Sequence, residues 1–171
     1  MIKGFKIPKV IFRVREGDTS NDEEICAIGG KWTDKSSDDF FKDKRVILFS
    51  LPGAFTPTCS SQQLPGFEKN AAKFRDLGID DIYCCSVNDS YVMNAWGETN
   101  KIGENITMLA DPYLSFTKLI GAEVDRNSKG MGIRSCRYAM IINNLEVQNI
   151  QEEEETKNCG ISSADGILSI I

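Results

Sequence analysis

The sequence of 171 residues contains six cysteines and no histidine, so thiol chemistry is the first kind to consider. Without histidine the chain cannot form a Ser-His-Asp triad, a Cys-His nucleophile pair or a histidine-ligated zinc site. No two cysteines have the C-x-x-C spacing of a zinc ribbon or a thioredoxin-type dithiol. A thiol is therefore the leading candidate for any catalytic group. The thiols are Cys26, Cys59, Cys84, Cys85, Cys136 and Cys159.

Cys59 occupies the position that best suits a reactive thiol. The apolar run 45–51 predicts a buried strand, and Pro57 and Thr58 predict a stop and an N-cap, so that a helix begins at about Cys59. Unpaired backbone N–H groups and the helix dipole stabilise a thiolate there, and Thr56 can donate its hydroxyl hydrogen to the sulfur. On position alone, a small buried hydrophobic residue at a helix start explains Cys59 equally well.

Strands and helices alternate along most of the chain, which predicts a single α/β domain over residues 1–171. The order favours a mixed central sheet with helices on both faces. A long polar connection is expected over 15–39, with a short hairpin around Gly29-Gly30. We predict strands over 7–14, 45–51, 81–87 and 106–110, and a hairpin of strands 136–142 and 146–150 that turns at Asn143-Asn144. Helices are predicted from Cys59 to Gly78 and over 89–96, 113–120 and 163–171. Asn88 or Asp89 would cap the second of these helices, and a capping box at Ser162 would begin the last.

The composition excludes several classes of function. A net charge of −5 without a basic stripe disfavours nucleic-acid binding. No apolar run is long enough to span a membrane and no signal peptide is recognised, so we expect no membrane association and a cytoplasmic location, although an organellar one stays open. Thiols in such a reducing compartment are expected to be mostly free.

The residues around Cys59 resemble the signature of the peroxiredoxins. That signature is Pro52-x-x-x-Thr56-x-x-Cys59, and the longer string PGAFTPTCS, continued by LPGF at 64–67, is similar to the type II, or fifth, subfamily. The resemblance implies a thioredoxin-like fold, with a mixed central sheet flanked by helices on both faces. Further matching blocks, in the family's order, are CCSVND at 84–89, AWG at 95–97, ADP at 110–112 and RSCRY at 134–138.

The resemblance also implies a role for each of four residues. Cys59 would be the peroxidatic nucleophile, Thr56 would hydrogen-bond the peroxide, and Pro52 would shield the thiolate from water. An arginine from a distant strand would complete the pocket, and its place in the block favours Arg137 over Arg134. A guanidinium stabilises both the thiolate and the charge that develops as the O–O bond breaks.

After attack, Cys59 becomes a sulfenic acid that a second thiol must reduce. The resemblance leaves three routes: a resolving Cys159, a resolving Cys84, or direct attack by glutathione or glutaredoxin. Cys84 also fits a buried strand residue, whereas Cys159 is expected to be exposed in a polar loop. Our hypothesis is an intramolecular Cys59–Cys159 disulfide that thioredoxin or glutaredoxin reduces. Cys26, Cys85 and Cys136 are expected to take no part.

These features predict a thiol peroxidase that reduces hydrogen peroxide and alkyl hydroperoxides without a metal, haem or nucleotide cofactor. The resemblance implies a homodimer, with thioredoxin, glutaredoxin or glutathione as the reductant. An alternative is a non-enzymatic redox sensor that passes the oxidation of Cys59 to a partner. A dithiol oxidoreductase is disfavoured because the chain has no C-x-x-C motif.

Overall fold

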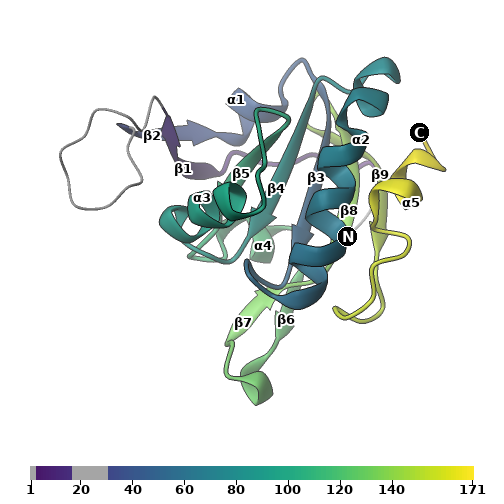
Figure 1. The fold of residues 1–171 in the computed structure, drawn as a ribbon. Helices are drawn as coiled ribbons and strands as arrows, with labels where there is room; N and C mark the ends of the chain where they lie inside the picture. The colour runs from purple at the N-terminus through teal and green to yellow at the C-terminus, as the bar shows by residue number, and fades with distance from the viewer. Residues whose placement is uncertain (1–2, 17–30) are drawn as a thin grey trace.

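A five-stranded mixed sheet of order β5-β4-β3-β8-β9 forms the centre of the molecule, seen in a computed structural model that describes residues 3–16 and 31–171 (Figure 1). β3 runs parallel to β4 and antiparallel to β8, with Phe49 opposite Cys84 on one side and Ala139 on the other. Separate two-stranded sheets join β1 to β2 and β6 to β7. The elements are β1 (Ile11–Glu16), β2 (Lys31–Ser36), α1 (Ser37–Phe41), β3 (Arg45–Leu51), η1 (Cys59–Gln63), α2 (Leu64–Asp76), β4 (Asp81–Ser86), α3 (Ser90–Thr99), β5 (Ile106–Ala110), α4 (Ser115–Leu119), β6 (Glu123–Asp125), η2 (Asn127–Lys129), β7 (Ile133–Ser135), β8 (Tyr138–Asn143), β9 (Glu146–Glu152) and α5 (Ala164–Leu168).

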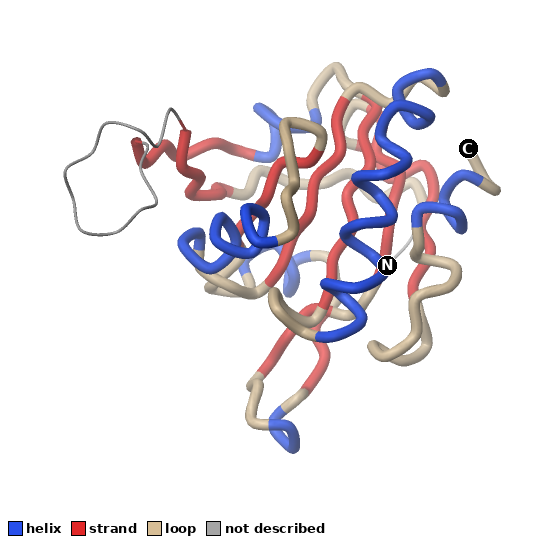
Figure 2. The backbone as a smooth tube through the Cα atoms, viewed as in Figure 1, coloured by secondary structure: helices blue, strands red, loops and turns tan. Residues whose placement is uncertain are grey.

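Strand β3 is buried on both faces, as its unbroken apolar run predicts. Because side chains alternate along a strand, Ile47, Phe49 and Leu51 enter one hydrophobic cluster, whereas Val46 and Leu48 enter the other. Helices lie on both faces of the sheet (Figure 2), which confirms the predicted arrangement.

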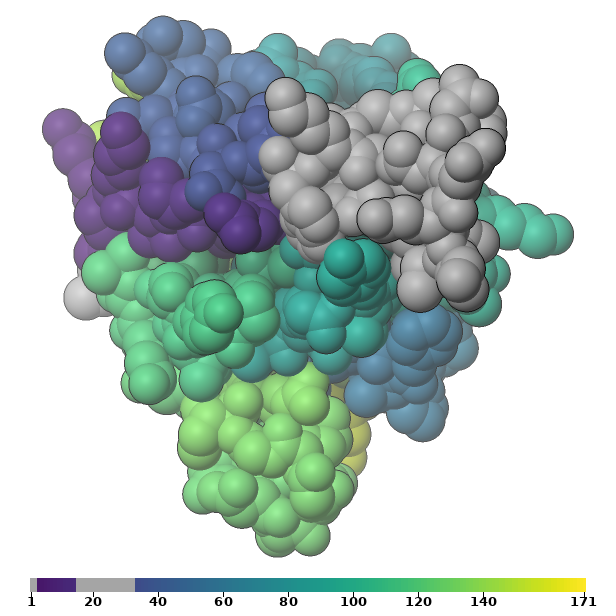
Figure 3. Space-filling model, turned by 90° about the vertical axis from the view of Figure 1, so that its left-hand side faces the viewer, coloured from purple at the N-terminus to yellow at the C-terminus, as the bar shows by residue number. Residues whose placement is uncertain are grey.

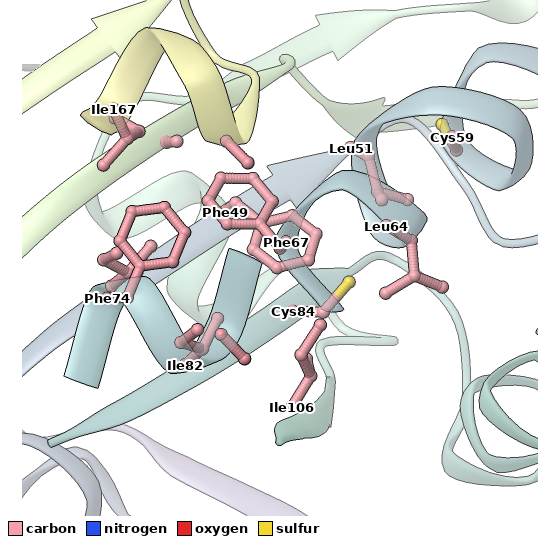
Figure 4. Packing of buried hydrophobic residues seen from close by; sticks show 14 of the residues in the cluster. Phe49, Leu51, Cys59, Leu64, Phe67, Phe74, Ile82, Cys84, Ile106 and Ile167 are labelled. Atoms are coloured by element: carbon pink, nitrogen blue, oxygen red, sulfur yellow. The ribbon is translucent and has the colours of Figure 1, made fainter. Parts of the chain in front are cut away.

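The first cluster lies between the sheet and the helices α2, α3 and α5. The rings of Phe49 and Phe67 stack there with centroids 4.2 Å apart (Figure 4). Gly66 of α2 faces Ala164 of α5, where an added Cβ would lie 3.7 Å from the alanine methyl. Helix α2 ends as predicted, since Gly78 has a φ of 78° and takes the left-handed conformation that closes a helix.

The second cluster covers the opposite face of the sheet, where aromatic rings from β1, α1 and α4 pack among aliphatic side chains. Phe12 of β1 lies 5.8 Å from Phe40 and 5.7 Å from Phe116, measured between ring centroids. Tyr83 of β4 contacts Phe40 edge-on. This face therefore acts as the structural support of the sheet.

Several predicted boundaries of the first part of the chain are wrong. The first strand begins at Ile11 rather than residue 7. The polar stretch after it contains β2 and α1. The sequence of β2 shows no alternation of apolar and polar residues, because β2 pairs only with β1 in a small separate sheet. The hairpin expected around Gly29-Gly30 lies outside the described residues, as does Cys26.

The later part of the chain also contains corrections. The β8–β9 turn is centred on Asn144 and Leu145, both with positive φ, one residue later than predicted. The cap of α5 is Ser163, whose hydroxyl oxygen accepts from the Gly166 N–H, and Ser162 instead donates its hydroxyl hydrogen to Glu153.

The β6–β7 hairpin was not predicted because its strands have only three residues each. Figures 1 and 3 show this hairpin extending away from the body of the molecule.

Over residues 3–16 and 31–171, no helix has the length and apolar character needed to cross a bilayer.

Candidate active site

Three parts of the chain meet around the Cys59 sulfur. The segment after β3 leads into η1 and supplies Cys59, which is fully buried. The residue directly before β8 is Arg137, and segment 153–162, which follows β9, covers its guanidinium. Since β3 and β8 are neighbours in the sheet, their pairing brings residues 78 positions apart within contact distance.

The helix that carries Cys59 begins earlier than predicted. Helical backbone starts at Pro57, and the Ser60 N–H donates to the Thr56 carbonyl over 3.0 Å. Thr58 has helical dihedral angles and makes no capping bond, so its predicted role as N-cap is wrong. Proline suits the first helical position because its missing N–H has no partner there in any case. Cys59 therefore lies in the first turn, as expected, but two residues further inside it.

The turn at Cys59 is a π-helix rather than an α-helix. The Leu64 N–H donates to the Cys59 carbonyl, five residues back. Pro65 follows and has no N–H to offer to the Ser61 carbonyl, so an α-helical ladder is interrupted at this point in any case. Such widened turns are frequent at functional sites.

Thr56 contacts the Cys59 sulfur directly. Its Oγ1 lies 2.8 Å from Cys59 Sγ and 2.8 Å from the Gly53 carbonyl oxygen. A hydroxyl has one hydrogen, so Thr56 can donate it to a thiolate or to Gly53, and in the second case its oxygen can accept from a thiol. The contact fits both protonation states of the sulfur.

Arg137 is the arginine that reaches Cys59. It is 1% exposed, and its Nη2 lies 3.2 Å from Cys59 Sγ. The Nε and Nη2 groups donate to the Thr156 carbonyl, and Nη1 donates to Gln63 Oε1. Among the residues that the structure describes, none of these partners is a carboxylate. A buried cation needs a counter-charge, and a Cys59 thiolate in direct contact with Arg137 can supply one.

Arg134 lies on another side of the site and does not contact the sulfur. Its Nε donates to the Met131 carbonyl and its Nη1 to the Val87 carbonyl. The preference for Arg137 over Arg134 thus agrees with the geometry, because residues three apart around the β7–β8 connection point to different places.

Gln63 is a part of the site that the sequence reasoning missed. Its side chain is fully buried, accepts from Arg137 Nη1 and donates through Nε2 to the Ser162 carbonyl, 3.2 Å away. Positions four apart share one face of a helix, so its spacing from Cys59 was the available signal. The glutamine links the arginine to the segment that covers it.

Pro52 is buried at the end of β3, and the turn after it is tightly held. Asn88 Oδ1 accepts the Ala54 N–H over 3.0 Å. A Cβ added at Gly53 would lie 3.2 Å from Arg134 Nη1, so a larger residue fits there only if the guanidinium shifts.

The other described cysteines are free thiols in different surroundings. Cys84 is fully buried in β4. Burial is the main cause that raises the pKa of its thiol, and the nearby Cys59 adds to the effect. Cys159 is half-buried rather than exposed, which corrects the expectation from its polar loop. Burial raises the pKa of Cys159, and Arg137 opposes that effect. Burial also raises the pKa of Cys136 to about 11, with Glu152 adding to the effect.

A family model, curated relatives and solved structures are similar to this chain. A family model described as Redoxin matches residues 15–168. A peroxiredoxin from Rhizobium etli is 46% identical over 97% of this chain and 94% of its own length, and the hybrid peroxiredoxin hyPrx5 of Haemophilus influenzae is 41% identical over 99% of this chain and 66% of its own. The crystal structure of reduced Prx3 from Vibrio vulnificus in complex with hydrogen peroxide has a TM-score of 0.84, with 37% identity over 99% of this chain and 94% of that one. The predicted thioredoxin-like fold is confirmed.

Proposed function

The chain belongs to the peroxiredoxin family, close to its type II subfamily, and is a thiol peroxidase; on this premise we propose that Cys59 is the residue that attacks the peroxide. The observation that carries the proposal is the buried Arg137 guanidinium, which lies 3.2 Å from the Cys59 sulfur. A cation held in that position favours the thiolate over the thiol and offers an N–H to a bound oxygen.

In the proposed first step, the Cys59 thiolate attacks one oxygen of the hydroperoxide. An S–O bond forms while the O–O bond breaks, and the second oxygen leaves with the bonding electrons and takes up a proton as water or an alcohol. Sulfur is oxidised to sulfenic acid and the peroxide is reduced. Thr56 and Arg137 donate hydrogen bonds to the reacting oxygens, and buried Pro52 limits the access of water.

In the proposed second step, a thiolate attacks the sulfur of the Cys59 sulfenic acid. An S–S bond forms and hydroxide leaves, to be protonated to water. We propose Cys159 as this thiol, supported by its place in the segment that covers Arg137. Cys84, which is fully buried in β4 and belongs to the same apolar cluster as Cys59, is the alternative.

The reductant, assembly and location belong to the same proposal. Thioredoxin, glutaredoxin or glutathione would reduce the disulfide, and free thiols at the described cysteines suit a cytoplasmic location. A homodimer is supported by exposed Tyr91 and Tyr113, which line one hollow together with exposed Ile11.

The test is the consumption of hydrogen peroxide by single cysteine variants in the presence of a thiol reductant. Cys59→Ser should abolish turnover, and Cys136→Ser should leave it nearly unchanged. Substantial turnover by Cys59→Ser would refute the proposed nucleophile. Peptide mapping after one equivalent of peroxide should reveal a Cys59–Cys159 link, whereas a Cys59–Cys84 link or only a glutathione adduct would transfer the second step to those thiols.

A further inference from the structure

The carboxylate of Glu153 joins the two ends of segment 153–162. One oxygen of this carboxylate accepts three hydrogen bonds, from the Gly160 N–H at 2.7 Å and from the N–H and hydroxyl of Ser162 at 2.9 Å each. The backbone of Glu153 is held independently, since its N–H donates to the Arg137 carbonyl. The side chain thus draws the far end of the segment back onto its own beginning, which forms a closed loop.

The loop supplies two of the contacts that orient Arg137. The Thr156 carbonyl accepts from Arg137 Nε at 3.1 Å and from Nη2 at 2.9 Å. The Ser162 carbonyl accepts from Gln63, which in turn accepts from Arg137 Nη1. Figure 1 shows this part of the chain, in yellow-green, beside the start of the helix that carries Cys59. Both carbonyls belong to the loop that Glu153 closes, and Thr58 adds a contact to the same loop by donating to the Lys157 carbonyl.

The neighbouring glutamates do not share this arrangement. Glu155 forms an exposed ion pair with Lys157, and Glu154 is exposed on the outside of the loop. Within this run of four glutamates, the Glu153 carboxylate closes the loop, whereas exposed Glu154 beside it can serve as a control position for mutagenesis. Burial opposes the ionisation of Glu153, but the hydrogen bonds from Ser162 and Gly160 and the charge of Arg137 outweigh it and lower its pKa.

We propose that Glu153 is a positioning residue of the peroxidase reaction, which holds the Arg137 guanidinium against Cys59 by closing loop 153–162. The inference rests on the proposed role of Arg137. Without the carboxylate, Thr156 and Ser162 lose their fixed positions and Arg137 can turn away from the sulfur. Small displacements of a group that acts on the reacting atoms cost a large part of the rate.

The experiment compares Glu153→Ala and Glu153→Gln with the control Glu154→Gln in the full-length reduced protein. Two quantities are measured: the second-order rate constant for hydrogen peroxide, and the pH profile of Cys59 alkylation followed by mass spectrometry. Glu153→Ala should slow the peroxide reaction by about tenfold and move the alkylation profile to higher pH, because a displaced guanidinium stabilises the thiolate less. Glu153→Gln keeps one acceptor oxygen and should show a smaller change, and Glu154→Gln should show none.

A purely structural role of Glu153 would give a different result. Thermal unfolding would shift, but the rate constant and the alkylation profile of the folded protein would stay as in the wild type, and this outcome would overturn the proposal. Glu153→Gln serves as the test variant if Glu153→Ala does not fold.

A double-mutant cycle separates this inference from the proposed function. If Glu153 acts through Arg137, Glu153→Ala should have no further effect in an Arg137→Lys background. Additive losses would overturn the positioning role while leaving Arg137 in place. A normal rate for Arg137→Lys alone would instead refute the proposed function.

Discussion

The two faces of the central sheet differ in the kinds of residue that cover them. One face carries the aromatic cluster around Phe12, Phe40 and Phe116, where packing decides the arrangement. The other face carries an apolar cluster that includes Cys59 (Figure 4). Buried Arg137 contacts the Cys59 sulfur and the buried side chain of Gln63. Stability and chemistry are therefore largely separated, and substitutions on the two faces should have different consequences.

The largest effect is expected on the aromatic face. Phe116→Ala removes a fully buried ring and should lower the free energy of unfolding by about 3–5 kcal/mol. The rate constant of the remaining folded enzyme should not change. Leu119→Ala, on the same short helix but 43% exposed, is the matched control and should be nearly neutral in chemical denaturation. A loss of the intrinsic rate constant in Phe116→Ala would show that the two faces are coupled.

Arg137→Lys should have the next largest effect, and on activity rather than stability. Lysine keeps the charge but loses the planar fork that contacts the Cys59 sulfur and the Thr156 carbonyl together. We expect the peroxide rate constant to fall about 100-fold, equivalent to about 2.7 kcal/mol, in stopped-flow measurements. Arg134→Lys should be much milder, and equal losses would contradict the assignment of Arg137.

Gln63→Met tests the polar contact that the sequence reasoning missed. The substitution nearly preserves the volume but leaves a buried N–H of Arg137 without its acceptor, and we expect about a tenfold slower peroxide reaction. Gln62→Met changes the adjacent, exposed glutamine and should react at the wild-type rate. Similar behaviour of the two variants in the same stopped-flow assay would rule out a role of Gln63 in holding Arg137.

The smallest effect concerns acid stability. Because the pKa of Glu153 lies below its ordinary value of 4.5, its contacts stabilise the folded state fully above that pH, and this contribution is lost as the pH falls through the lowered pKa. The wild type should therefore lose more thermal stability on acidification than Glu153→Gln. Parallel losses in the two proteins would show that other carboxylates account for the acid sensitivity.

Local features of the fold were readily predicted from the sequence. The bounds of β3 and β5 were predicted correctly because their apolar runs are short and clearly limited. The glycine after α2 was also anticipated, and the cap of α3 is Asp89, one of the two residues predicted for it. Each depends on one residue type with a local hydrogen bond or backbone conformation. By contrast β2, β6 and β7 lack such a pattern, because they pair in small sheets outside the main core.

For the site, the sequence by itself determined which thiol to consider and which residues accompany it: Pro52, Thr56 and Cys59 lie within one turn and its helix start, so local spacing places them together. Tertiary structure alone decided that Cys159 is half-buried and that Gln63 and Glu153 hold the arginine in place. It also brings Arg137, which the family resemblance already favoured over Arg134, to the sulfur. The physical reason is that these contacts join distant segments and run largely through backbone carbonyl and N–H groups. Every residue has a backbone carbonyl, and every residue except proline has a backbone N–H. The identity of a residue therefore does not reveal which backbone groups meet in the folded protein.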